Sequence, residues 1–190
     1  MVLRLVGSEM CIRDRANLVG LSVATDEDNA YYIPVGHDYE GAPKQLDRDE
    51  VLKKLKPIIE KTPLIGQHLK FDRNVLANYD IHLNAIENDT MLMSYVYDPT
   101  ATRHNLDAMA SHYLNVKTTT FEDVAGKGVK QLTFNQIPLE KASDYAAEDA
   151  DITFRCYSHL KPALAKTPSL EKVLHEIELP LVPVLSDMEQ

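Results

Sequence analysis

Residues 144–151, Asp-Tyr-Ala-Ala-Glu-Asp-Ala-Asp, are the stretch on which the prediction of the fold depends. The surrounding segment has helical character, and Tyr145 and Asp149 are four positions apart, so they share one helix face about a turn from each other. A carboxylate in this position can hold a cation while the phenol orients a metal-bound water. Asp151 points away from that face. Spacing alone fits a solvated acidic helix face at least as well.

A second acidic position lies in residues 64–73, Leu-Ile-Gly-Gln-His-Leu-Lys-Phe-Asp-Arg. The apolar run from Pro63 to Gly66 predicts a short buried strand that Gly66 ends. Asp72 then falls in the opening turn of a helix that runs to about Tyr79. Its carboxylate either satisfies amide groups at the helix start or projects into a cleft beyond the strand end, where α/β folds place their sites. Both interpretations stay open on this window.

Taken together, the two windows resemble the 3′–5′ proofreading exonuclease domain of bacterial DNA polymerase I. Residues 66–72 resemble its second motif, and residues 145–149 resemble its third, the Tyr-x-x-x-Asp form of the DEDD exonucleases. The resemblance extends in the same order over roughly residues 16–190. Further matching stretches are 17–24, 32–35, 89–92, 103–104 and 121–137.

The resemblance implies an α/β protein with a ribonuclease-H-like mixed β-sheet flanked by helices. It also implies hydrolysis with two divalent cations, Mg²⁺ or otherwise Mn²⁺ or Zn²⁺. In this family pattern Asp149 would ligate the ion that activates water, and Tyr145 would orient that water. Asp72 would hold the second ion, largely through its water shell.

The resemblance further implies that the 3′ end of single-stranded DNA is the partner of this site. Phe121 would stack on a base, and Arg103 would contact a phosphate. Gln67, His68 and Phe71, in and beside the second motif, complete the expected substrate-binding set. The alternatives are a core aromatic for Phe121 and a surface histidine without a role for His68, which stands where enterobacterial members have Asn.

The front of the chain departs from the family pattern. The family carries an Asp-x-Glu motif on the first strand, but residues 1–15 contain only the acids Glu9 and Asp14, five positions apart. The segment also resembles a spurious peptide found at the ends of gene predictions. We expect residues 1–15 to be a non-native N-terminus and the sheet to lack its first catalytic strand. The chain should then bind magnesium poorly and be weak or inactive.

The remaining sequence predicts the following layout. Strands are expected at 18–24, 30–35, 63–66 and 81–86. Helices are expected at 47–61, from 88 or 89 to 97, at 105–114 and from Pro138 onward, and residues 118–138 should be irregular. Residues 16–165 would form the exonuclease domain, and residues 166–190 the helical start of a polymerase domain, interrupted at Pro180 and Pro183.

Composition narrows the class of protein. The chain has 190 residues, 44% hydrophobic and 26% charged, and a formal net charge of −9, which argues against a non-specific nucleic-acid wrapper. The two cysteines, Cys11 and Cys156, exclude a disulfide framework. The cysteine content is compatible with a reducing cytoplasm, so we expect a cytoplasmic, nucleoid-associated bacterial protein. No apolar run reaches membrane-spanning length, so we expect no membrane partner. Its other partner would be the polymerase domain of a full-length chain.

A ribonuclease-D-like RNA exonuclease and a metal-free vestigial domain remain alternatives.

Overall fold

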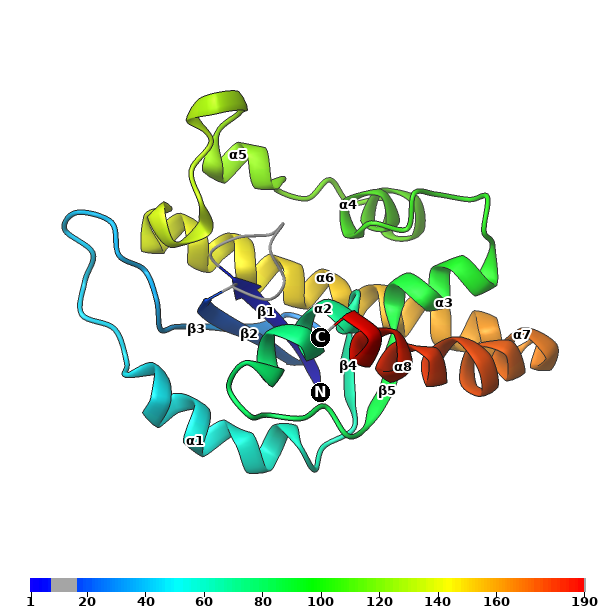
Figure 1. The fold of residues 1–190 in the computed structure, drawn as a ribbon. Coiled ribbons are helices and arrows are strands. Elements are labelled where there is room, and N and C mark those ends of the chain that lie inside the picture. Colours follow the sequence, from blue (N-terminus) through cyan, green and yellow to red (C-terminus); the bar gives the residue numbers. More distant parts are fainter. Residues whose placement is uncertain (8–16, 190) are drawn as a thin grey trace.

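A computed structural model describes residues 1–7 and 17–189 of the chain, with helices packed on both faces of a five-stranded sheet (Figure 1). The strand order is β3-β2-β1-β4-β5. The strands are β1 (Val2–Gly7), β2 (Leu18–Asp26), β3 (Asn29–Pro34), β4 (Leu64–Gly66) and β5 (Ile86–Asp89). The β1–β2 and β2–β3 pairs are antiparallel, whereas β4 is parallel to β1 and to β5. The predicted mixed α/β sheet is confirmed.

The expectation that the sheet lacks its first strand is wrong. Residues 2–7 form β1, the middle strand, which pairs with β2 on one side and β4 on the other. Val2 and Leu3 are buried, on opposite faces of the sheet. An apolar stretch can therefore supply the backbone hydrogen bonds and side-chain volume of a central strand without carrying the acidic motif. Glu9 and Asp14 lie outside the described residues.

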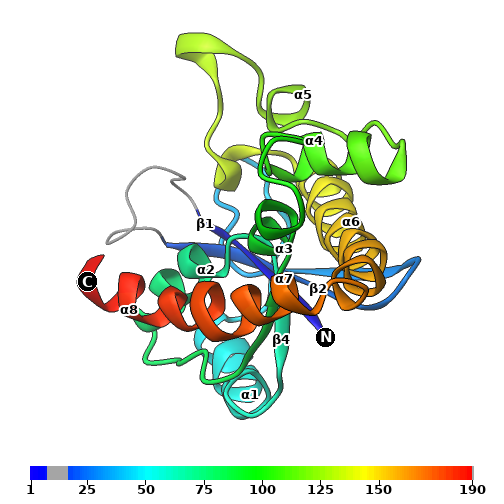
Figure 2. The same ribbon diagram turned by 90° about the vertical axis from the view of Figure 1, so that its right-hand side faces the viewer.

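Two helical layers enclose the sheet (Figure 2). The layer on one face contains α1 (Arg48–Ile59) and α2 (Leu69–Ala77). The opposite layer contains α3 (Thr90–Tyr97), α4 (Leu106–Met109), the π-helical turn η1 (Ala110–Leu114) and the long α6 (Leu139–Ala165). Each layer has its own apolar core against one face of the sheet, and β3 and β5 are the two edge strands.

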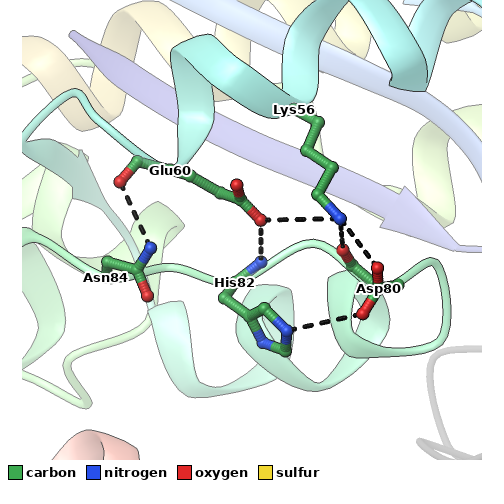
Figure 3. Close-up of polar contacts among 5 residues, drawn as sticks. All are labelled: Lys56, Glu60, Asp80, His82 and Asn84. Carbon is green, nitrogen blue, oxygen red and sulfur yellow. Dashed lines mark hydrogen bonds and ion pairs between the residues drawn. The ribbon is translucent and has the colours of Figure 1, made fainter.

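Polar contacts close the far end of the α1–α2 layer (Figure 3). Lys56 on α1 pairs with Asp80 at 2.8 Å, and the Glu60 carboxylate accepts the backbone N–H of His82 at 3.2 Å. The amide of Asn84 donates to the Glu60 carbonyl at 3.3 Å. The start of α1 is also fixed as predicted, because Asp47 accepts the N–H of Glu50 at 3.0 Å.

Two stretches differ from the predicted layout. The strand expected at 81–86 forms instead at Ile86–Asp89, because the backbone of β4 pairs with residues 86–89. Ile81 and Leu83 are buried by packing alone. The stretch expected to be irregular contains α5 (Phe121–Ala125) and two 3₁₀ turns, η2 (Gly128–Lys130) and η3 (Phe134–Gln136). A capping box between Thr120 and Asp123 starts α5 and is visible in the sequence.

The C-terminal segment is helical throughout its described length. It consists of α7 (Pro168–Val173), the π-helical turn η4 (Leu174–Glu178) and α8 (Leu179–Glu189). Neither Pro180 nor Pro183 interrupts the helix, contrary to the prediction. Pro180 lies inside a continuous helix, directly after the π-helical turn η4, whose wider backbone precedes the proline. Within residues 1–7 and 17–189, no helix combines the length and apolar character needed to cross a membrane.

Candidate functional site

The long helix α6 places Tyr145 and Asp149 on one face, as their spacing predicts. Asp149 is almost fully buried, and its Oδ2 lies 2.9 Å from Nε of Arg4 on β1. Tyr145 stands one turn before Asp149 on the same helix, and the two side chains interact electrostatically. Asp151 turns elsewhere, as expected, because its carboxylate accepts the N–H of Asp28 in the β2–β3 turn at 3.1 Å.

Arg4 is the residue around which the site is organised. Burial lowers the pKa of its guanidinium, but Asp149, Tyr145 and Asp72 together raise that pKa by more, so Arg4 stays charged. Asp72 on α2 and Asp149 on α6 therefore act on one cation although they come from opposite helical layers. The sequence prediction for residues 1–15 depends on their acids alone. The signal that this prediction missed is Arg4 itself, a basic residue between apolar neighbours on the central strand of the sheet.

Burial shifts the pKa values of the two α6 side chains in the same direction. Burial raises the pKa of Asp149, and Asp107 and Glu148 raise it further, while Arg4 lowers it. Burial also raises the pKa of Tyr145 well above its usual range, helped by the negative charge of Asp149. Tyr145 is thus a protonated phenol at neutral pH, able to donate a hydrogen bond.

Asp72 lies in α2, directly behind the strand β4, and is 2% exposed. It is not the cap of its helix. That function belongs to Asp89, whose carboxylate accepts the N–H groups of His68 at 3.1 Å and Leu69 at 2.7 Å. Asp89 also caps α3. Of the two interpretations left open by the sequence, the structure thus disfavours the helix-start role for Asp72.

Aromatic side chains form a wall behind Tyr145. Phe134 is 1% exposed, and its ring centroid lies 6.1 Å from that of Tyr145. Phe121, at the start of α5, lies 6.2 Å from Tyr145 in an edge-to-face arrangement and is only partly buried. Phe121 therefore has one face in the cluster and keeps some surface available to a ligand, which is compatible with both of its predicted roles.

The three predicted substrate contacts at the second motif have different environments. Gln67 is buried, and its side-chain amide donates to the His104 carbonyl at 2.9 Å and accepts from the Thr90 hydroxyl. His68 has a left-handed backbone, with φ of 61°, at the start of α2. Phe71 packs partly against the core beneath α1 and α2. Contacts from these side chains to a nucleotide stay a prediction.

Arg103 is exposed and lines an open cleft of about 730 Å³. The cleft runs along the segment before and within α4 and η1, and its lining includes Asn105, Asp107, Ser111 and His112. Asp107 raises the pKa of both Tyr145 and Asp149, so its negative charge acts on the two site residues of α6. Sequence reasoning missed Asp107, because nothing in its own window distinguishes it from a solvated helix residue.

The two divalent cations implied by the resemblance do not fit the side chains as they stand. Among the described residues, no group of three or more histidines, cysteines or acids is arranged to hold a metal ion. One oxygen of Asp149 is already occupied by Arg4 at 2.9 Å. Magnesium requires several hard oxygen ligands, and a guanidinium in their midst repels it.

Comparisons with known sequences give a consistent result. A sequence profile described as 3′-5′ exonuclease matches residues 8–165. DNA polymerase I of Pseudomonas aeruginosa is 53% identical over 180 residues, and DNA polymerase I of Chloroflexus aurantiacus is 36% identical over 178 residues. These alignments cover 93% and 92% of this chain but 20% and 18% of the relatives. The chain thus spans about a fifth of the length of these relatives.

Solved structures share the fold at low identity. The polymerase structure of Pol1 from M. smegmatis, in complex with a DNA primer-template and dNTP, matches with a TM-score of 0.70 and 21% identity. The match covers 99% of this chain and 28% of that chain. NrnC of Brucella melitensis matches with a TM-score of 0.64 and 18% identity, covering 99% of this chain and 83% of that one. Both support the ribonuclease-H-like arrangement of strands and helices.

Proposed function

This chain belongs to the family of 3′–5′ exonuclease domains of DNA polymerase I, and from this premise we propose that it is the proofreading part of such a polymerase. The proposed substrate is the 3′ end of single-stranded DNA. The proposed reaction is hydrolysis of the terminal phosphodiester. A water oxygen bonds to phosphorus, and the bond from phosphorus to the 3′ oxygen of the preceding nucleotide breaks.

One observation carries this proposal: Arg4 lies 2.9 Å from Asp149, which shares a face of α6 with Tyr145, and the charge of Asp72 acts on the same guanidinium. In the proposed site Tyr145, kept protonated by its buried setting, donates a hydrogen bond and orients the attacking water. Asp149 and Asp72 would hold divalent cations, which would offset the negative charge of the scissile phosphate. These roles follow the family pattern at matching positions.

The same geometry limits the activity of this chain. Membership of the family implies the use of divalent metal ions, yet Arg4 holds Asp149 and the acidic pair of the first motif is missing. We therefore propose that residues 1–190 hold the DNA end but hydrolyse it weakly. The binding contribution comes from groups that need no metal, namely Phe121 by stacking and Arg103 by its charge.

The cleft of Arg103 is the proposed path of the single strand. Asp107 in its lining acts by its charge on Tyr145 and Asp149, and the Phe121 ring lies 6.2 Å from the Tyr145 ring. A strand laid between Arg103 and Phe121 would bring its 3′ end to Asp149. Residues 166–190 are proposed to begin a polymerase domain, and α7, η4 and α8 lie within this segment.

A metal-free domain that only holds DNA is the second candidate, and the ion pair between Arg4 and Asp149 favours it. This candidate shares the DNA-binding surface but lacks hydrolysis altogether. A ribonuclease-D-like exonuclease would be distinguished by a preference for RNA. Assays with one set of substrates can distinguish the three candidate functions.

The test uses 5′-labelled single-stranded DNA and RNA of the same sequence, with Mg²⁺ or Mn²⁺. Residues 1–190 should trim DNA slowly from the 3′ end, Arg4→Asp should trim it faster, and Asp149→Ala should abolish trimming in both backgrounds. Asp151→Ala is the matched control, since Asp151 is on the same helix but contacts Asp28.

Equal trimming by the wild type and Arg4→Asp would contradict the proposed site, as would trimming that survives Asp149→Ala. Preferential trimming of RNA would favour the ribonuclease alternative.

A further inference from the structure

The outer face of α2 carries a set of polar contacts to α8 that the reaction does not explain. Lys70, Arg73 and Asn74 are spaced so that they share one face of α2. Lys70 pairs with Glu189 at 2.7 Å, and Arg73 pairs with Asp187 at 2.7 Å. In both ribbon views α8 runs directly beside α2 (Figures 1 and 2).

The centre of this contact is buried. Ser186 is fully buried and Asn74 is 5% exposed. The Ser186 hydroxyl accepts a hydrogen bond from the Arg73 guanidinium and donates one to the side-chain oxygen of Asn74. Glu189 accepts from the Asn74 amide at 3.3 Å. Buried polar groups are costly unless paired, so this network fixes how α8 sits on α2 along the helix axis.

The helix that receives these contacts is short and carries Asp72. Nine residues form α2, a length at which an isolated helix is marginal in water. Its orientation therefore depends on what surrounds it. The inner face of α2 packs against the apolar core, and the Asp89 carboxylate accepts hydrogen bonds from the N–H groups at its start. On the outer face, α8 contacts Arg73, the residue next to Asp72.

We propose that Arg73 and Ser186 are positioning residues for Asp72, and that α8 works as a latch that sets the orientation of α2 in the site. The inference rests on the proposed function, because the site role of Asp72 gives that orientation its meaning. Tyr145 and Asp149 stand on α6 and have no part in the α2–α8 contact. A displacement of α8 thus changes the place of Asp72 relative to Arg4 while leaving the α6 half of the site as it is.

The test compares Arg73→Ala and Ser186→Ala with the wild-type chain by hydrogen–deuterium exchange and by the ¹³Cγ NMR signals of Asp72 and Asp149. Exchange within residues 69–77 should become about tenfold faster, the equivalent of one lost hydrogen bond, while residues 139–165 keep their protection. The Asp72 signal should shift and the Asp149 signal should stay. Arg73→Lys, which keeps the charge facing Asp187, should restore part of the Asp72 signal position.

Lys172→Ala is the matched control, because it removes only an exposed pair with Glu176 in the same C-terminal segment. If Arg73→Ala does not fold, Ser186→Ala carries the test, since it deletes a single oxygen. Unchanged exchange in α2 while α8 loosens would overturn the proposal, and so would equal movement of the Asp72 and Asp149 signals. Neither readout depends on cleavage, so failure of the proposed function would appear only in the trimming assay.

Discussion

The two helices that carry the acidic residues of the site, α6 and α2, are built in opposite ways. Asp149 belongs to a helix of 27 residues, shares a face with Tyr145 and lies near the aromatic wall of Phe134 and Phe121. Asp72 belongs to a helix of nine residues. Its supports come from β5, through Asp89, and from α8, more than 100 positions further along the chain.

The site therefore has two halves. Local sequence determines the position of the α6 half, which carries Tyr145 and Asp149, whereas contacts distant in sequence determine the position of the α2 half, which carries Asp72. The α6 half depends on helical spacing and on aromatic packing next to it in the sequence. The α2 half depends on polar contacts that exist only in the folded protein. We therefore expect changes near α6 to cost stability, and changes around α2 to alter the position of Asp72 at lower cost.

The largest expected effect is that of Phe134→Ala. Phe134 is 1% exposed and contacts the rings of Tyr145, Tyr32 and His37, so its loss leaves a cavity behind Tyr145. We expect the free energy of unfolding to fall by about 3–5 kcal/mol, measured by urea denaturation. Phe134→Leu is the control and should cost clearly less. A loss under about 1 kcal/mol would show that the aromatic wall does not support the α6 half.

The next effect is expected for Asp89→Ala, which removes the cap of two helices at once. Asp89 accepts N–H groups of His68 and Leu69 at the start of α2 and of Met91 at 3.0 Å in α3. Losing both caps should lower the free energy of unfolding by about 2–4 kcal/mol. Hydrogen exchange should rise in α2 and α3 but not in α6. Uniform loosening of all three helices would contradict the idea that α2 has separate supports.

Gly66→Ala is expected to act more mildly on the same half. A Cβ at Gly66 would lie 2.3 Å from Cδ2 of Leu69 and 3.0 Å from the Leu3 carbonyl oxygen. Leu69 is fully buried and must move, at a cost of about 1–3 kcal/mol. Combining Gly66→Ala with Leu69→Ala should cost less than the sum of the two single changes. Strict additivity in thermal unfolding would rule out this clash.

The smallest effect is expected for Lys56→Ala in the exposed cluster of Figure 3. The hydrogen bond from Lys56 lowers the pKa of Asp80, so its stabilising contribution is present at neutral pH and is lost as acid protonates Asp80. The change in Tm should be smaller than for any of the variants above. The difference from wild type should persist down to about pH 4 and shrink as the pH falls below that value. A difference that grows in acid would contradict this assignment.

The local half of the site could be predicted from the sequence, and the distant half only in part. Tyr145 and Asp149 lie as their spacing of four requires, because a helix fixes side-chain direction over one turn. The strand before Gly66 and the cap at Asp89 also follow from short windows. That Asp89 reaches a second helix does not, since its contact to Leu69 spans 20 positions.

The role of Arg4 could not be predicted for a different reason. The missing acidic motif suggested that the first strand itself was missing. A sheet selects a strand for its apolar faces and backbone hydrogen bonds, however, and Val2 and Leu3 satisfy those demands. Once the strand is in place, its third position along β1 faces Asp149 whatever its chemistry. A basic Arg4 in place of an acidic residue therefore changes the charge of the site but preserves the fold.

Binding of Mn²⁺, followed by electron paramagnetic resonance, tests the central claim most directly, namely that Asp72, Tyr145 and Asp149 form one site whose negative charge Arg4 neutralises. The account predicts that the wild-type chain binds Mn²⁺ weakly and that Arg4→Asp binds it about 10-fold more tightly or better. Adding Asp149→Asn to Arg4→Asp should remove that gain, and Asp151→Asn should not. Equally tight binding by the wild type and Arg4→Asp, or a gain that survives Asp149→Asn, would contradict the account.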